Sequence, residues 1–205
     1  MAPHAGAPHV EAQRADEGRT LRADAQRNRD AILEAAAAAF AEHGTAASLE
    51  DVAKRAGVGI GTLYRHFPTR QALLEAVYRD QVEALRALTV DLLDSASADE
   101  ALATWMRAFV TFGSTKRSLS SALLATLDKE SELLSSCSRV IRESATAMLT
   151  RAQQAGTARA DASVSDLIRL AHAITMAVER PPAEDGQLDR LLAIVLDGLR
   201  PQPPG

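Results

Sequence analysis

The chain has 205 residues, a formal net charge of −4 and a single cysteine, Cys137. This length allows one or two domains with real cores, and a lone cysteine excludes an intrachain disulfide framework and suits a reducing cytoplasm. Hydrophobic residues make up 46% of the chain and aromatic residues only 3%, so the apolar content is mainly Ala and Leu, which favours helices. With no apolar run of membrane-span or signal-peptide length, we expect a soluble, cytoplasmic, all-α protein.

The first segment, residues 1–20, mixes Pro, Ala, Gly and charged residues without hydrophobic periodicity, which predicts a disordered tail. Residues 28–43 then predict a helix that ends at Gly44. Two interpretations stay open for the arginines in and after the tail: contact with phosphate groups, or a solvated tail in which acidic residues are interspersed. These arginines are Arg14, Arg19, Arg22, Arg27 and Arg29.

The chain is organised around residues 48–74, SLEDVAKRAGVGIGTLYRHFPTRQALL. Ser48 can cap a first short helix, and Gly57 follows where that helix must stop. A second apolar face follows, on which Leu63 and Phe67 are predicted core residues. Two short helices joined by a glycine turn form a helix-turn-helix, whose second helix fits the major groove of DNA.

The charge pattern of the motif supports this interpretation. No Asp or Glu occurs from Val52 to Leu74. The same segment holds five basic or titratable cationic residues: Lys54, Arg55, Arg65, His66 and Arg70. Because a carboxylate would repel the phosphate backbone, an acid-free surface is what DNA binding requires. In a chain with a negative net charge, the prediction rests on this local distribution.

This motif, above all GIGTLYRHFPTRQALL, resembles the helix-turn-helix of the tetracycline-repressor (TetR) family over about Arg27 to Leu74. The chain departs from the family pattern at Gly59, where a small capping residue is more usual, and at Ala72, where an acidic residue often completes a capping box. Both departures weaken helix ends by about 1 kcal/mol or less.

The resemblance implies a helix-turn-helix DNA-binding domain at residues 21–74, joined to a helical bundle at residues 75–205 that binds an effector and dimerises. It implies a homodimeric transcriptional regulator, most simply a repressor that a small molecule releases from a palindromic operator in double-stranded DNA.

The resemblance also assigns DNA contacts to nine residues: Ser48, Gly59, Ile60, Gly61, Thr62, Tyr64, Arg65, His66 and Arg70. Thr62 and Arg65 have the chemistry to reach base edges. Tyr64 and His66 match the phosphate-contacting pair of the family. Arg70 holds the position of the family's phosphate-binding lysine, at a helix N-terminus that itself favours anions.

Apolar periodicity predicts several further helices after the motif. They cover about residues 69–95, 97–115, 119–127 and 129–154, a segment from Ser163 to before Pro181, and a last helix carrying Leu188 to Leu199. Two copies of the last two helices are predicted to pack as a four-helix bundle. The apolar residues expected at that contact are Leu167, Ile174, Leu188, Leu191, Val195 and Leu199.

A candidate effector pocket follows from the resemblance and from the aromatic face of the middle helices. The residues expected to line it are Trp105, Met106, Phe109, Phe112, Cys137, Met148, His172 and Met176. The alternative is that this face is simply core, with His172 a hydrogen-bonded core histidine.

No catalytic motif, metal-ligand spacing or cofactor signature is evident, so we expect neither an enzyme nor a cofactor. Two alternatives to the ligand-responsive repressor stay open. One is a DNA-binding regulator of the same fold without a small-molecule effector, and the other is a helical-bundle ligand carrier or enzyme.

Overall fold

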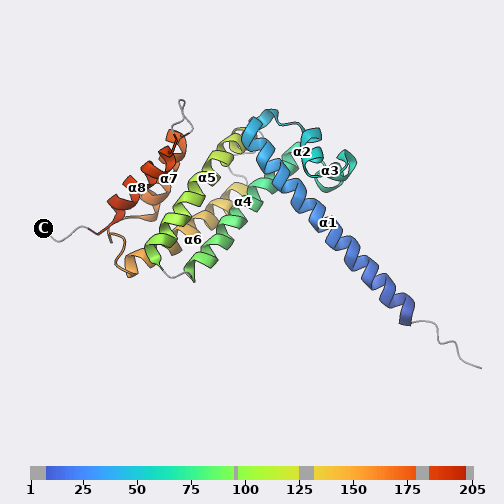
Figure 1. Ribbon diagram of the computed structural model, residues 1–205, viewed down its shortest axis with the longest axis horizontal. Coiled ribbons are helices and arrows are strands. Elements are labelled where there is room, and N and C mark those ends of the chain that lie inside the picture. Colours follow the sequence, from blue (N-terminus) through green and yellow to red (C-terminus); the bar gives the residue numbers. More distant parts are fainter. Residues whose placement is uncertain (1–7, 95–96, 125–131, 179–184, 202–205) are drawn as a thin grey trace, which may run out of the picture.

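The computed structural model describes residues 8–94, 97–124, 132–178 and 185–201, and every regular element in these ranges is a helix (Figure 1). In chain order the elements are α1 Pro8–His43, the 3₁₀ turn η1 Gly44–Ala46, α2 Leu49–Arg55, α3 Ile60–His66, α4 Arg70–Leu93, α5 Ala98–Leu124, α6 Glu132–Gln154, α7 Val164–Val178 and α8 Gln187–Leu199. The all-α prediction is confirmed, and α2 and α3 form the predicted helix-turn-helix.

The first helix, α1, is longer than the sequence predicts. It begins at Pro8, which contradicts the disordered tail expected up to residue 20; residues 1–7 lie outside the described part of the chain. The segment has no apolar stripe, but it is rich in Ala, Arg, Glu and Gln, which have high helix propensity, and proline is tolerated at the first helical position. In Figure 1 the N-terminal part of α1 extends away from the rest of the molecule.

Side-chain caps fix the starts of the helices around the motif. The Ser48 Oγ accepts the N–H of Asp51 at 3.4 Å at the start of α2. The Thr69 Oγ1 accepts the N–H of Ala72 at 3.0 Å at the start of α4. After α2, Gly57 adopts φ of 68°, a left-handed conformation that glycine reaches without steric cost. The turn between α2 and α3 is therefore encoded locally.

The fifth helix, α5, is one continuous helix where two were predicted, over residues 97–115 and 119–127; residues 125–127 lie outside the described ranges. Gly113 does not stop it. A Cβ at that position would lie 2.6 Å from the Thr175 Oγ1, so the glycine allows α5 and α7 to pack closely. The following residues contain no proline, and nothing else in the segment interrupts a helix.

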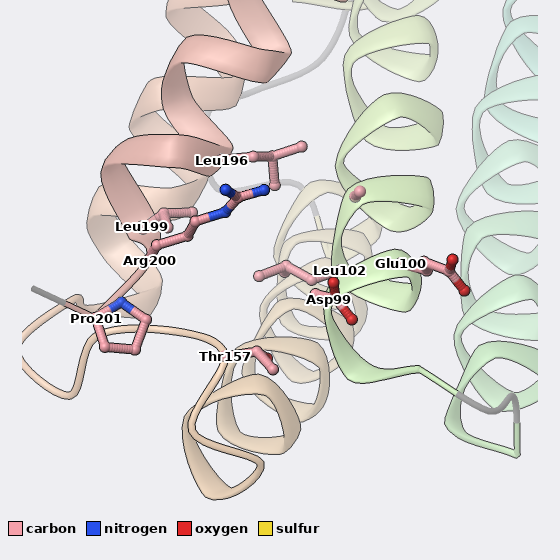
Figure 2. Close-up of a pocket in the computed structure, with 9 residues that line it drawn as sticks. Asp99, Glu100, Leu102, Thr157, Leu196, Leu199, Arg200 and Pro201 are labelled. Atoms are coloured by element: carbon pink, nitrogen blue, oxygen red, sulfur yellow. The ribbon is translucent and has the colours of Figure 1, made fainter.

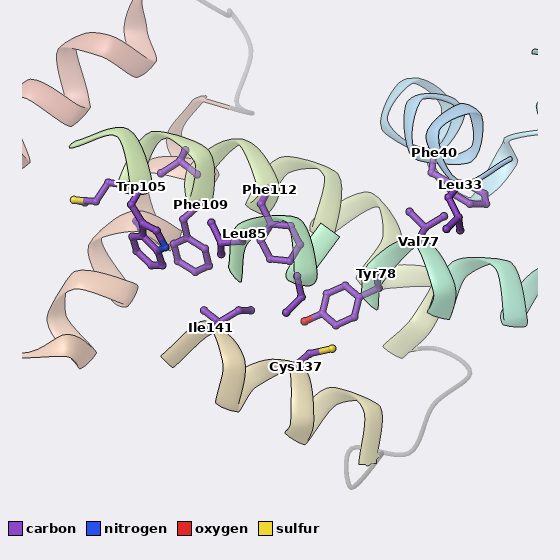
Figure 3. Close-up of a cluster of buried hydrophobic side chains, with 14 of the residues drawn as sticks. Leu33, Phe40, Val77, Tyr78, Leu85, Trp105, Phe109, Phe112, Cys137 and Ile141 are labelled. Carbon is purple, nitrogen blue, oxygen red and sulfur yellow. The ribbon is translucent and has the colours of Figure 1, made fainter. Parts of the chain in front are cut away.

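One hydrophobic core runs from α1 to α8, and its aromatic part lies between α4, α5 and α6 (Figure 3). Its rings form a row: the centroid of Tyr78 lies 5.9 Å from that of Phe112, Phe112 lies 6.1 Å from Phe109, and Phe109 lies 5.1 Å from Trp105. The Trp105 Nε1 donates to the Thr89 Oγ1 at 3.0 Å. Burial raises the pKa of Tyr78 to about 12, so its hydroxyl stays protonated at neutral pH.

Two helices connect this bundle to the helix-turn-helix. The fourth helix, α4, starts in the helix-turn-helix and continues into the bundle; near its start Val77 lies beside Leu33 and Phe40 of α1 (Figure 3). The other is α5, which packs against α1 and η1. At the far end α7 and α8 pack on α5, and an ion pair between Arg107 and Asp189 joins α5 to α8.

Candidate nucleic-acid interface

The second helix of the motif, α3, buries one face and offers the other to solvent. Leu63 is fully buried and Phe67, its C-cap, is 5% exposed, as predicted. On the outward face Ile60 and Tyr64 are 39% and 45% exposed, beside the exposed Arg65. An exposed apolar and aromatic pair next to a guanidinium is a surface suited to a partner that carries both apolar and anionic groups.

Two glycines keep the N-terminal end of this face narrow. A Cβ added at Gly59 or Gly61 would meet no heavy atom within 4 Å, and neither residue has a positive φ. The fold of the chain therefore does not require glycine at either position. Their absent side chains do leave room for a partner's backbone or base edge to approach α3 closely.

Two further predicted contact residues, Thr62 and His66, are half-buried on α3. The imidazole of His66 lies 6.3 Å from the Phe67 ring at a tilted angle. Ser48 is exposed, but its hydroxyl is engaged: besides capping α2, it donates to the Glu50 carboxylate at 2.7 Å. Ser48 is therefore primarily a helix cap in this structure.

Arg55 contributes less positive charge than the sequence suggests. It donates to both carboxylate oxygens of Glu42 on α1, at 2.9 and 2.8 Å, and to Asp51 on α2 at 2.8 Å. These hydrogen bonds lower the pKa of Glu42 and raise that of Arg55. Glu42 and Asp51, which lie outside the acid-free segment, thus neutralise the charge of Arg55. This arginine joins α2 to α1 and adds little positive charge to the surface.

Arg70 differs most from its predicted role. Its Nη1 donates to the carbonyl of Ala47 at 2.7 Å, and its guanidinium lies 5.4 Å from the centroid of the Phe40 ring. A second cation lies over a ring, which the sequence did not predict: the Arg29 guanidinium is 5.8 Å from the centroid of Phe67. No spacing signal could have found either contact, because the partners come from helices that meet only in the fold.

The predicted effector-pocket residues separate into two groups. Trp105, Met106, Phe109, Phe112, Cys137 and Met148 are buried together in the core. His172 and Met176 are exposed on the surface of α7, although the His172 ring still lies 5.4 Å from Phe109. The aromatic face is therefore packed core, and His172 and Met176 lie on the surface of α7, apart from the other six residues. That these eight residues line an effector pocket stays a prediction.

The described part of the chain also has cavities that the predicted set does not line as a group. One of about 490 Å³ lies between the start of α5, the segment after α6 and the end of α8, with Asp99 and Arg200 on opposite sides (Figure 2). A groove of about 840 Å³ follows α6 and includes Arg139, Arg142 and Arg151. A third, of about 270 Å³ between α4 and α5, is lined by only one of the predicted pocket residues, Phe112.

The apolar surface of α7 and α8 differs from the predicted dimer contact. Leu167, Ile174 and Leu199 are buried within the chain, whereas Leu188, Leu191 and Val195 are half-buried. The large apolar side chains that these helices expose are Leu170, Met176 and Ile194, at 40%, 53% and 68%.

The helix-turn-helix, its exposed α3 face and the attached bundle are features of DNA-binding regulators. Residues 32–77 match the profile described as bacterial regulatory proteins, tetR family, and residues 97–201 match that of the SbtR-like transcriptional regulator C-terminal domain. The chain belongs to the TetR family of transcriptional regulators.

Solved structures and curated relatives agree with this assignment. The TetR regulator SCO0520 of Streptomyces coelicolor is 39% identical, with a TM-score of 0.77 over 85% of this chain and 99% of that one. A TetR regulator of Mycobacterium vanbaalenii is 36% identical, with a TM-score of 0.72 over 88% and 99%. The transcriptional repressor KstR2 of Mycolicibacterium smegmatis is 37% identical over 71 residues, or 34% of this chain and 35% of that relative. The chain thus aligns with about a third of the length of this curated relative.

A metal site and a membrane-spanning helix each require features that the described residues lack. Among them, no group of three or more His, Cys, Asp or Glu side chains is arranged to hold a metal ion. None of the helices there combines the length and the apolar character that crossing a bilayer demands.

Proposed function

We propose that the protein is a homodimeric, sequence-specific DNA-binding repressor. The observation that carries this proposal is the outward face of α3, where Ile60, Tyr64 and Arg65 are exposed while Leu63 and Phe67 anchor the helix from behind. A rigid helix with an acid-free outward face can enter the major groove, where the tyrosine and arginine reach phosphates and base edges. DNA binding would place the protein in the cytoplasm, as the sequence predicts.

The dimer completes this proposal. A symmetric pair presents two α3 helices to successive major grooves, so the operator is a palindrome with half-sites about one helical turn apart. Ile194, Leu170 and Met176 are exposed apolar side chains on the helices predicted to pair, and a second copy would remove them from water.

Release by a small molecule is typical of the family, and we infer the same regulation here. The effector would favour a conformer in which the two α3 helices no longer match the groove spacing, which requires a differential affinity of about 1–3 kcal/mol. One observation favours the alternative without an effector: the aromatic face expected to form the pocket is filled by its own rings. Titrating the protein–operator complex with a metabolite panel distinguishes a regulator with an effector from one without: only the former releases the operator when a metabolite is added.

The test of DNA binding is selection of bound duplexes from a random pool at stated salt. We expect a palindromic motif. Tyr64→Ala should then weaken binding to the selected duplex about tenfold or more, the cost of one good contact. Tyr64→Phe shows how much of the affinity comes from the hydroxyl and how much from the ring. Val90→Ala, at a 50% exposed position near the end of α4, is the matched control. Unchanged affinity in Tyr64→Ala with an intact fold would contradict the proposal.

A further inference from the structure

We propose that Arg70 is a positioning residue that couples α4 to the start of α2, and not a phosphate ligand. This inference rests on the proposed DNA-binding function and concerns how the helix-turn-helix is held in its binding geometry. It departs from the role that sequence resemblance assigns to this position.

The geometry places Arg70 at a junction. It is the first residue of α4, half-buried, and its Nη1 donates to the Ala47 carbonyl at 2.7 Å. Ala47 is 2% exposed and directly precedes Ser48, the N-cap of α2. The same guanidinium lies 5.4 Å from the Phe40 centroid on α1. One side chain therefore contacts the end of α1, the segment before α2 and its own helix α4.

The chemistry of this contact requires arginine. A planar guanidinium can stack on an aromatic ring with its face and donate hydrogen bonds from its edge at the same time. A lysine ammonium has neither the plane nor the fixed fork, so it would keep the charge and lose the combined contact. A phosphate ligand at a helix N-terminus has no such requirement, because a point charge suffices.

The contact also lies where the bundle meets the DNA-binding domain. The turn η1, just before Ala47, packs against α5 as well as α1. A shift of α4 would thus be transmitted through Arg70 to Ala47 and the start of α2, which packs on α3. This gives the proposed effector response a physical link to the recognition surface.

The first experiment compares Arg70→Gln, Arg70→Lys and Arg65→Gln on the selected palindromic duplex over a range of salt. A positioning residue predicts that both Arg70 variants lose about tenfold in affinity while the slope of log K against log salt stays that of the wild type. Arg65→Gln, on the exposed face of α3, should reduce the slope by about two, because one phosphate contact is lost in each protomer of the dimer. Near-normal binding by Arg70→Lys, with a slope reduced by about two in Arg70→Gln, would identify a phosphate ligand in each protomer and overturn the proposal.

The second experiment needs no DNA, so its outcome is separate from that of the proposed function. Amide hydrogen exchange of the free protein should be at least several-fold faster over residues 47–53 in both Arg70 variants and unchanged there in Arg65→Gln. If Arg70→Gln does not fold, Arg70→Lys carries the comparison, because it retains the charge. Wild-type exchange over residues 47–53 in both Arg70 variants would exclude the positioning role.

Discussion

The hydroxyl of Thr89 is a buried polar group that contributes to the free energy of unfolding of this core. It donates to the Leu85 carbonyl at 2.8 Å and accepts the indole N–H of Trp105 at 3.0 Å. Thr89→Val keeps the shape but leaves the buried indole N–H without an acceptor, so we expect a loss of about 1–3 kcal/mol in the free energy of unfolding.

Urea unfolding followed by the fluorescence of Trp105, the chain's single tryptophan, measures this loss. The matched control is Thr146→Val on α6, an exposed threonine that also donates to the carbonyl four residues back, at 2.7 Å. It should change the unfolding free energy by less than about 0.5 kcal/mol. Equal effects of the two substitutions would show that the indole contact contributes nothing.

A second residue, Gly113, decides how closely α5 and α7 approach. An added Cβ would lie 2.6 Å from the Thr175 Oγ1 and 3.0 Å from its Cγ2. Gly113→Ala should therefore lower the unfolding free energy by about 1–3 kcal/mol through overpacking, and Thr175→Ala in the same chain should restore part of it. Gly198→Ala, where a Cβ meets nothing within 4 Å, is the control. A Gly113→Ala protein as stable as the wild type would contradict this account.

Among the helices, α7 has the most complete local start signal. The N–H of Asp166 donates to the Ser163 Oγ at 3.2 Å, and the N–H and hydroxyl of Ser163 donate to the Asp166 carboxylate at 3.3 and 2.5 Å. These bonds lower the pKa of Asp166 below its ordinary 3.8, because they stabilise the carboxylate; Arg169 adds a smaller attraction. A lowered folded-state pKa contributes stability above the unfolded pKa that is lost as pH falls through the folded one.

The α7 cap therefore makes stability depend on acid pH. Asp166→Asn should lower the melting temperature at pH 7, and the difference from wild type should shrink as the pH falls below 3.8. Thermal melts from pH 2 to 7 measure it. In a Ser163→Ala background the pH-dependent part of the Asp166→Asn effect should be smaller, since the main donor is gone. A difference that is the same at every pH would rule out the carboxylate as its source.

For the whole molecule, the exposed face of α7 and α8 is where assembly is expected. Ile194 is 68% exposed on α8, so Ile194→Glu should leave the fold of the chain intact and shift it from dimer to monomer. Val90→Glu, at a 50% exposed position on α4, is the matched control and should remain dimeric. Sedimentation velocity distinguishes the two. A wild type that is monomeric at micromolar concentration, or a dimeric Ile194→Glu, would contradict the proposed interface.

The sequence by itself determined the all-α class and the helix-turn-helix motif, but not the start of α1 or the continuity of α5. Ser48 caps α2 and Gly57 ends it, as their spacing predicts, and Thr69 and Ser163 cap α4 and α7 in the same local way. These features depend on hydrogen bonds and backbone angles within three or four residues, so local sequence suffices. The apolar face of α3 was likewise predictable from its periodicity, and Leu63 is fully buried as expected.

Only the tertiary structure decided how the faces are used. Periodicity identifies an apolar stripe on a helix. It does not say whether the space between that stripe and the neighbouring helices stays open as a pocket or is filled by side chains. Here the rings of Trp105 and Phe109 stack on each other and fill it. In the same way, Arg55 and Arg70 are basic residues in the sequence, yet in the folded chain Arg55 pairs with Glu42 at the surface and Arg70 donates to the Ala47 carbonyl. The physical reason is that these partners lie 13 and 23 residues away along the chain and become neighbours only when α1, α2 and α4 pack together.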